Sequence, residues 1–434
     1  MQPVHIDMAW IEESPPIMHD TRNTVVIYLL LLATGLFVGH LQVNAIPGVP
    51  SHGRYHASDM DDLQMQIYGQ SARPKHYAAG ADHPAWYFIC GVYQKTSAAL
   101  GLKGMRLWNI TVPCLLGLNL VLFMALARQI GFPTFQALGL TAIWLGSGAT
   151  INWSVVLETH VLAPTSLLLA ALILTHPRLI PRIWNHASTP TLATLGLSVA
   201  IAASITITNG MLAALAMIPA RFVRRAQPLR LARESVRRLP TLLTAVLVGI
   251  GILGLIHTAG WYLVKDPTMR HFLEILGERR LLPYMEGSWW DSILSFAWIA
   301  PPMSEYTGDP PETMMTMERN WATAPAYFSG LIVFILTVCS IRFHSARTMF
   351  MPLFVVFGLV LHSVYGLAES FLFAANYTWA TVISIGLIGR WMFPRSLGWI
   401  SLCLGAVMLV VNVAIWKSGI DWIVQNGYLL PPSP

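Results

Sequence analysis

Charged residues are scarce in this sequence, since Asp, Glu, Lys and Arg together make up only 11% of its 434 residues. Hydrophobic residues make up 55%, and the mean hydropathy is +0.55. A water-soluble globular domain does not reach this combination, so the composition excludes that class. Apolar runs of roughly 17 to 25 residues, the length that crosses a hydrocarbon layer, recur from Thr24 to Trp416. The sequence therefore predicts an integral membrane protein.

The alternation of polar and apolar residues that marks a membrane β-barrel strand is also missing. The first run contains the stretch Ile27–Leu32, which does not alternate. Backbone polar groups in lipid must be satisfied within the segment that carries them, which a helix achieves on its own. We therefore expect an all-α bundle of transmembrane helices.

Cysteine is rare and dispersed, with only four residues in the chain, three of them inside apolar runs. Cys90, Cys114, Cys339 and Cys403 therefore offer neither a disulfide framework nor the spacing of a metal site. No internal repeat is visible either, which weakens the case for a transporter built from inverted repeats.

The net charge of +6 at pH 7 comes largely from basic residues in short loops between apolar runs, notably from Arg221 to Arg238. Positive residues that flank spans mark the cytoplasmic side of a membrane, so topology explains this charge and nucleic-acid binding is not expected. The first apolar run follows a polar segment with acids rather than a short basic one. We therefore expect a retained first span and no secretory signal peptide.

Taken in order, the runs predict about eleven spans, with the amino terminus in the cytoplasm and the strongest arginine clusters on the same side. Residues 1–23 form a cytoplasmic tail, residues 24–264 a transmembrane bundle with a first outer loop at 42–105, residues 265–325 a second outer loop, and residues 326–434 the last helices and a tail. The expected spans lie at about 24–41, 107–127, 134–149, 155–174, 192–206, a short one ending near 221, then 242–264, 327–341, 350–366, 371–392 and 397–416.

The first outer loop holds three carboxylates within four residues, Asp59, Asp61 and Asp62. Prolines and glycines divide this loop into short pieces, two of which have apolar residues at helical spacing. We expect a short amphipathic helix beside the aspartates and a second one from Pro84 to Leu100, both half immersed at the membrane surface. The acids would then be held at the boundary between lipid and water.

Further polar residues fall near span ends on the same predicted face. Glu158 and Glu369 lie near membrane depth, where an ionised side chain is costly and is usually functional or paired. Each could instead extend to the interface or pair with a nearby cation. Transfer of a sugar from a lipid-linked phosphate needs a carboxylate to deprotonate the attacking hydroxyl and a cation to neutralise the departing phosphate. The second loop supplies cations at Lys265, Arg270, His271 and Arg319.

The order of these features resembles the C-type membrane glycosyltransferase superfamily (GT-C), which includes protein O-mannosyltransferases and lipid A aminoarabinose transferases. The resemblance covers roughly the first 180 residues by motif and the remainder only by topology. The sequence departs from the family pattern at two positions. The first acid pair is Asp-Asp rather than Asp-Glu, and Ala85 stands where the family has proline. The matching residues are Asp61-Asp62, with Asp59 just before them, and His83-Pro84-Ala85-Trp86-Tyr87, while Glu158 is similar to a second acid of some relatives.

The resemblance implies a polyprenyl-phosphate sugar donor, inverting transfer, and an active site that faces the periplasm or cell exterior from the inner membrane. We assign Asp61 the role of general base or of the acid that orients the acceptor, with Asp62 and Asp59 as alternatives. Asp61 and Asp62 could also hold Mg²⁺ or Mn²⁺, since some relatives use a divalent metal and others do not, and the spacing does not decide. The candidate substrate-binding residues are His83, Glu158, Lys265, Arg270, His271, Arg319 and Glu369.

Other classes stay open at this point. A multi-span transporter would place its acids at the middle of spans. A polysaccharide polymerase or ligase would rely on outer-face arginines rather than on an aspartate pair, and a scaffold would leave acids near membrane depth unexplained. The sequence names neither the sugar nor the acceptor, which could be a glycan, a lipid or a protein.

Overall fold

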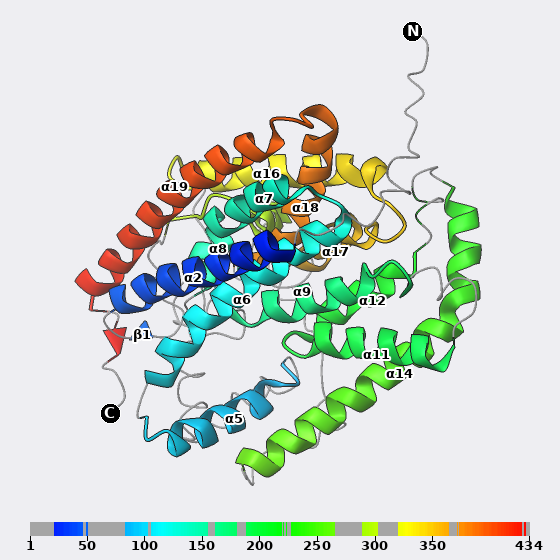
Figure 1. Cartoon of the computed structure of the whole chain (residues 1–434), viewed down its shortest axis with the longest axis horizontal. Coiled ribbons are helices and arrows are strands. Elements are labelled where there is room, and N and C mark those ends of the chain that lie inside the picture. The colour runs from blue at the N-terminus through cyan, green and yellow to red at the C-terminus, as the bar shows by residue number, and fades with distance from the viewer. Residues whose placement is uncertain are drawn as a thin grey trace.

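The computed structural model describes residues 21–46, 49–50, 83–102, 106–154, 161–179, 188–218, 220, 223, 227–264, 289–302, 320–363, 371, 373–427 and 429–430. Within these residues the regular structure is helical apart from two strands of two residues each, which confirms the all-α fold class (Figure 1). Strands β1 (Val49–Pro50) and β2 (Leu429–Leu430) pair antiparallel. The α-helices are α2 (Thr21–Ala45), α5 (Trp86–Ala99), α6 (Arg106–Ile130), α7 (Thr134–Gly146), α8 (Gly148–Trp153), α9 (Ala163–Leu174), α11 (Thr189–Ala203), α12 (Met211–Ala216), α14 (Pro228–Val264), α16 (Ala324–Cys339), α17 (Phe350–His362), α18 (Ala374–Met392) and α19 (Leu397–Gln425), and the 3₁₀ helices are η3 (Ile207–Gly210), η4 (Trp289–Phe296) and η5 (Ser340–Phe343).

Five helices in the described part of the chain are long and apolar enough to cross a membrane, as expected of a multi-pass membrane protein. They comprise Asn23–Ala45, Arg106–Ile130, Pro228–Gly260, Ala324–Phe343 and Leu397–Gln425. At about 1.5 Å per residue even the shortest reaches about 30 Å, the thickness of the hydrocarbon layer. These five coincide with the first, second, seventh, eighth and last predicted spans.

Four other predicted spans are apolar helices too short to cross a membrane as single straight segments. α7, α9, α11 and α17 have 13, 12, 15 and 13 residues. The apolar run at 134–149 continues past the end of α7 at Gly146, so hydropathy overestimates the length of that helix. α11 has the 15 residues predicted for its span, and the runs at 155–174 and 350–366 extend into residues outside the described part. The predicted total of about eleven spans is therefore not confirmed.

The first part of helix α18, predicted as the tenth span, lies inside the protein. Each residue from Ala374 to Ser384 is buried, including the polar residues Asn376, Thr378 and Thr381. A helix that is buried all round packs against other helices rather than lipid. α18 accordingly contacts α7, α9, α16 and α17, and it lies among them in Figure 1.

Two pairs of helices approach so closely that glycine is required at their contacts. α7 and α19 run side by side, and a Cβ atom added to Gly146 would lie 2.4 Å from the carbonyl oxygen of Gly405. α2 and α6 meet in the same way, since a Cβ atom on Gly35 would lie 2.3 Å from the Cα atom of Gly117. Small residues allow this approach, and van der Waals packing then holds membrane helices together.

Helix α5 coincides with the second helix predicted for the first outer loop, and its placement at the membrane surface stays a prediction. Trp86, Cys90 and Tyr93 lie on its buried face, at the helical spacing that the sequence shows. This face packs on protein, since its residues belong to a buried cluster and the Tyr93 hydroxyl accepts from the backbone nitrogen of Trp108 at 3.0 Å. α14 contacts α5 at Phe88, where a Cβ atom on Gly260 would lie 2.6 Å from the backbone nitrogen. The other predicted amphipathic helix, near the aspartates, falls outside the described residues.

Residues 289–302 belong to the predicted second outer loop, yet this part of it lies inside the bundle, and we call it the re-entrant segment. It begins with η4, and every residue from Asp291 to Ala297 is buried. η4 packs against α16, α17 and α18, and Gly330 of α16 makes room for it, since a Cβ atom there would lie 2.4 Å from the carbonyl oxygen of Ile293. Irregular backbone at membrane depth is tolerated where protein surrounds it in this way.

Basic residues gather at one end of the bundle. Arg128 and Arg390 donate hydrogen bonds of 2.9 and 2.8 Å to the carbonyls of Phe132 and Gly131, in the turn between α6 and α7. We call this end the arginine end. It also holds Arg178, Arg342 and Arg395, since Gln129 bonds to Thr175 near Arg178, Arg342 lies over the ring of Trp391, and Gln136 bonds to Pro394 beside Arg395.

We call the opposite end of the bundle the loop end. The described residues next to five undescribed segments lie there, and these segments are 51–82, 155–160, 265–288, 303–319 and 364–370. In Figure 1 it lies toward the lower left, near β1 and the C-terminus. A single buried hydrophobic cluster joins residues within a few positions of these borders, namely Trp86, Val161, Leu294, Ala326 and Phe371.

Candidate functional site

His83 is the one predicted site residue that lies within the described part of the chain. It is half-buried just before α5, and its Nδ1–H donates to the carbonyl of Ile205 at the end of α11. The backbone nitrogen of Ala85 donates to the carbonyl of Ser204 at 2.8 Å, beside the first contact. These contacts attach the start of α5 to the end of α11, so His83 has a structural role at the loop end whatever else it binds.

The other predicted site residues lie outside the described residues, so their roles stay predictions. Among the residues that the structure does describe, no group of three or more His, Cys, Asp or Glu side chains could hold a metal ion. The predicted metal ligands fall outside that part, so the expectation of Mg²⁺ or Mn²⁺ is untested. The undescribed site residues are Asp59, Asp61, Asp62, Glu158, Lys265, Arg270, His271, Arg319 and Glu369.

Asp291 is a candidate that the sequence analysis missed. The described residues include three acids, and Asp291 is the buried one, with 7% of its surface exposed. Glu234 forms an ion pair of 3.8 Å with Arg237, and Asp421 is partly exposed beside Lys417. Burying a carboxylate costs several kcal/mol unless hydrogen bonds compensate it, so this acid requires an explanation.

One partner of Asp291 is a tyrosine from the next helix. The hydroxyl of Tyr327, in the first turn of α16, donates to Oδ1 of Asp291. The sequence offers little warning of this pair, because Asp291 lies in a loop with many other charges and directly follows Trp289-Trp290, which reads as an interface anchor. Only the return of the chain into the bundle distinguishes it.

A buried asparagine fixes the far end of the re-entrant segment. The side-chain nitrogen of Asn412 in α19 donates to the carbonyls of Gly146 at 2.8 Å and Trp298 at 2.9 Å, and its oxygen accepts from Ala300 N at 2.8 Å. The carbonyl of Trp298 also accepts from Gly148 N at 2.6 Å. One amide thus joins α19, the break between α7 and α8, and the segment that carries Asp291.

Aromatic and imidazole rings form another part of the loop end. His362, the last residue of α17, is buried, stacks on Phe373 with ring centres 4.3 Å apart, and has Nε2 3.3 Å from the Tyr377 hydroxyl. Trp153 Nε1 donates to the carbonyl of Phe371 at 3.0 Å. The described residues bordering 155–160 and 364–370 therefore meet.

The loop end thus combines a buried carboxylate, phenol hydroxyls and aromatic rings on helices that pack into one cluster. A carboxylate of this kind can accept a proton or a hydrogen bond from a substrate hydroxyl. Hydroxyls and ring faces suit the polar edge and the apolar face of a sugar. Comparison of the chain with models of known protein families finds no match, and comparison with curated proteins finds no significant one.

Proposed function

We propose that the protein is a membrane glycosyltransferase that moves a sugar from a polyprenyl-phosphate donor to an acceptor hydroxyl at the loop end, with inversion. The observation that carries this proposal is the arrangement of the loop end. There Trp86, Val161, Ala326 and Phe371, each close to a segment that holds predicted acids or cations, meet in one buried cluster, and the buried carboxylate of Asp291 lies three positions before Leu294 of the same cluster. A site assembled from several loops on a rigid helical base is the usual form of an active site.

In this reaction Asp61 takes the proton of the acceptor hydroxyl, and the resulting oxygen attacks the anomeric carbon of the sugar. The bond from that carbon to the phosphate oxygen breaks, and polyprenyl phosphate leaves with the electron pair. Lys265, Arg270 and Arg319 are our candidates for neutralising its charge, with His271 sharing that role. Asp291 supplies a second carboxylate, held by Tyr327, that positions an acceptor hydroxyl.

The proposed topology has the arginine end in the cytoplasm and the loop end facing the periplasm or cell exterior, following the bias of basic residues. The proposed count remains about eleven spans. α7 and α8 support it at one position, because only Ser147 separates them. Together they run from Thr134 to Trp153, enough for about 30 Å at about 1.5 Å per residue.

Sugar transfer can be measured with the full-length protein in proteoliposomes that contain polyprenyl-phosphate mannose, glucose or aminoarabinose. We expect Asp61→Asn and Asp62→Asn to abolish transfer and Asp291→Asn to reduce kcat by about 10²-fold or more, as loss of a general base or positioning group does. Asp421→Asn is the matched control, because this partly exposed acid lies beside Lys417 near the end of α19. Full activity in all three variants would refute the proposal.

A transporter is the second candidate, and two observations favour it. The break between α7 and α8 and the re-entrant segment are the kind of interrupted helices that form substrate sites in transporters. The same proteoliposomes separate the two functions, since a transporter would move labelled donor across the membrane without forming a new glycosidic bond.

A further inference from the structure

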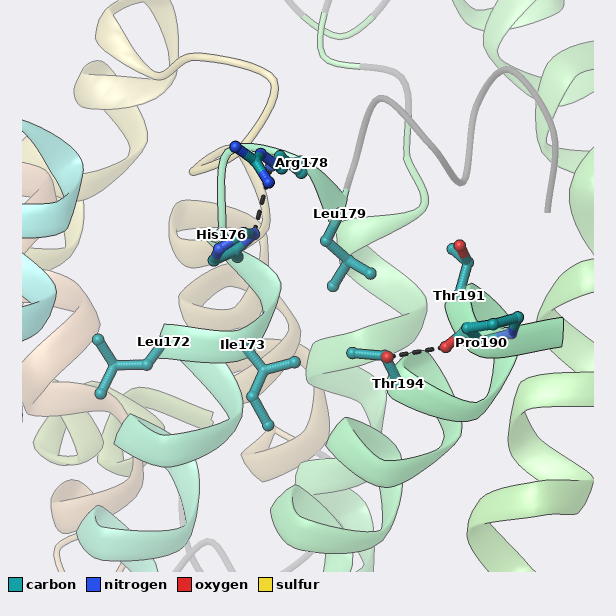
Figure 2. A pocket seen from close by; sticks show the side chains of 8 residues that line it. All are labelled: Leu172, Ile173, His176, Arg178, Leu179, Pro190, Thr191 and Thr194. Atoms are coloured by element: carbon teal, nitrogen blue, oxygen red, sulfur yellow. Dashed lines mark hydrogen bonds between the residues drawn. The ribbon is translucent and has the colours of Figure 1, made fainter. Parts of the chain in front are cut away.

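A cavity of about 480 Å³ opens at the arginine end, where the C-terminal end of α9 and the first turn of α11 face each other (Figure 2). Its volume lies within the roughly 300–1,000 Å³ typical of ligand sites. The proposed sugar-transfer site is at the opposite end of the bundle, so this cavity is separate from it. Its lining consists of Leu172, Ile173, His176, Arg178, Leu179, Pro190, Thr191 and Thr194.

The cavity has an apolar body and a polar rim. Figure 2 shows Leu172 and Ile173 on the α9 side and Pro190 on the α11 side, with His176 and Arg178 above them. Both rim residues are exposed, whereas Leu172 and Ile173 are half-buried. A ligand that fits must therefore carry an apolar part and a polar head.

Arg178 determines the charge of that head. Within the part of the chain that the structure describes, its guanidinium forms no ion pair or hydrogen bond. The three acids described there, Glu234, Asp291 and Asp421, each contact another residue. A guanidinium presents two parallel N–H donors that match a phosphate, so an external phosphate suits this position.

His176 adds a second donor beside it. The backbone nitrogen of Arg178 donates to Nδ1 of His176 at 3.3 Å, as drawn in Figure 2. Because Nδ1 accepts this bond, the proton of the neutral ring is on Nε2, which is then a donor. The start of α11 across the cavity adds the weak positive potential of a helix N-terminus.

We propose that this cavity binds a phosphate-bearing anionic lipid from the leaflet at the arginine end. The phosphate lies against Arg178 and His176, and an acyl chain follows Leu172 and Ile173 between α9 and α11. Basic pockets between membrane helices bind lipid headgroups through this combination of charge and apolar surface.

Native mass spectrometry of the full-length protein in neutral detergent tests the proposal, with phosphatidylglycerol as the probe and zwitterionic phosphatidylcholine as the comparison. We expect phosphatidylglycerol to bind more tightly, and Arg178→Gln to weaken it about fivefold, the effect of one arginine near a lipid phosphate. Arg395→Gln is the matched control, because Arg395 is exposed at the same end and does not line the cavity. Ile173→Phe should also weaken binding, since its larger ring occupies the path of the chain.

Three results would overturn the proposal. Equal binding of the two lipids would show that the charge of the headgroup does not determine binding. Equal effects of Arg178→Gln and Arg395→Gln would show that the lipid binds the basic surface in general. Displacement of phosphatidylglycerol by inorganic phosphate or glycerol phosphate would assign the cavity to a soluble phosphate compound. Retention of the lipid in the presence of both supports the lipid as the ligand.

Discussion

Replacing the buried His344 with glutamine should make the protein less sensitive to acid. His344 follows η5 at the arginine end, is completely buried, and has Nε2 3.1 Å from the hydroxyl oxygen of Ser340. Burial lowers the pKa of His344 from its ordinary value of 6.5 to about 3, and the backbone of Thr348 opposes this shift in part. The ring is therefore neutral in the folded protein at all pH values in ordinary use.

The sign of the effect follows from this difference in pKa. Below pH 6.5 the unfolded chain binds a proton at His344 and the folded chain does not, so acid favours unfolding. The contribution of the neutral ring to the free energy of unfolding is complete above pH 6.5, and it is lost as the pH falls from there toward about 3. At about 1.4 kcal/mol per pH unit, the free energy of unfolding falls by about 2 kcal/mol at about pH 5 from this residue alone.

The assay is thermal or denaturant unfolding of the purified protein in detergent at about pH 8 and about pH 5. His344→Gln keeps an N–H donor for Ser340 and removes the titration, so its stability should fall about 2 kcal/mol less than that of the wild type over this interval. Any cost of repacking is present at both pH values and cancels in the comparison. Asn426→Gln, at an exposed position without a titratable side chain, is the control and should keep the pH dependence of the wild type. Equal pH dependence in His344→Gln and the wild type would refute the reasoning.

Three further predictions concern packing and burial. Gly405→Ala should destabilise the protein by about 1–3 kcal/mol in the same unfolding assay, because its Cβ atom would lie 2.5 Å from the backbone of α7. Gly251→Ala, with nothing within 4 Å, should not destabilise it. Asn412→Leu removes three buried hydrogen bonds and should cost about 3 kcal/mol or more, whereas Asn426→Leu, at an exposed position on the end of α19, should change stability little. Cys90 should be the last of the four cysteines to react with N-ethylmaleimide and should react only when the protein unfolds. It is buried, and burial raises the pKa of its thiol. Early alkylation of Cys90 would contradict the packing of α5.

The sequence predicted the long helices because their signal is local. Apolar composition and helical spacing sufficed for α2, α6, α14, α16 and α19, and the spacing of Trp86, Cys90 and Tyr93 predicted the buried face of α5. Helix ends were harder, since a run such as 134–149 stays apolar across Ser147, where the backbone becomes extended and α8 begins.

The re-entrant segment could not be predicted in this way because distant residues hold it in place. Ala300 and Asn412 are separated by 112 positions, and Gly330 makes room for η4 only once α16 has packed against it. Composition around residue 290 is that of a loop, so no periodicity marked Asp291 as buried. Asn412 likewise reads as a single polar residue in an apolar run, and its three partners become visible only in the folded chain.

The burial of Asp291 is hard to explain by stability. A buried ionic or polar pair rarely stabilises a fold more than a hydrophobic pair of similar volume, because desolvation of the carboxylate offsets the hydrogen bond. Asp291 shares η4 with the buried apolar residues Ile293 and Leu294 and with the buried serines Ser292 and Ser295. The re-entrant segment is also fixed at its far end by Asn412, independently of the contact with Tyr327. The proposed reaction with a hydroxyl substrate would require a carboxylate on a rigid segment at the loop end, and this is our physical reason for proposing that Asp291 takes part in the chemistry.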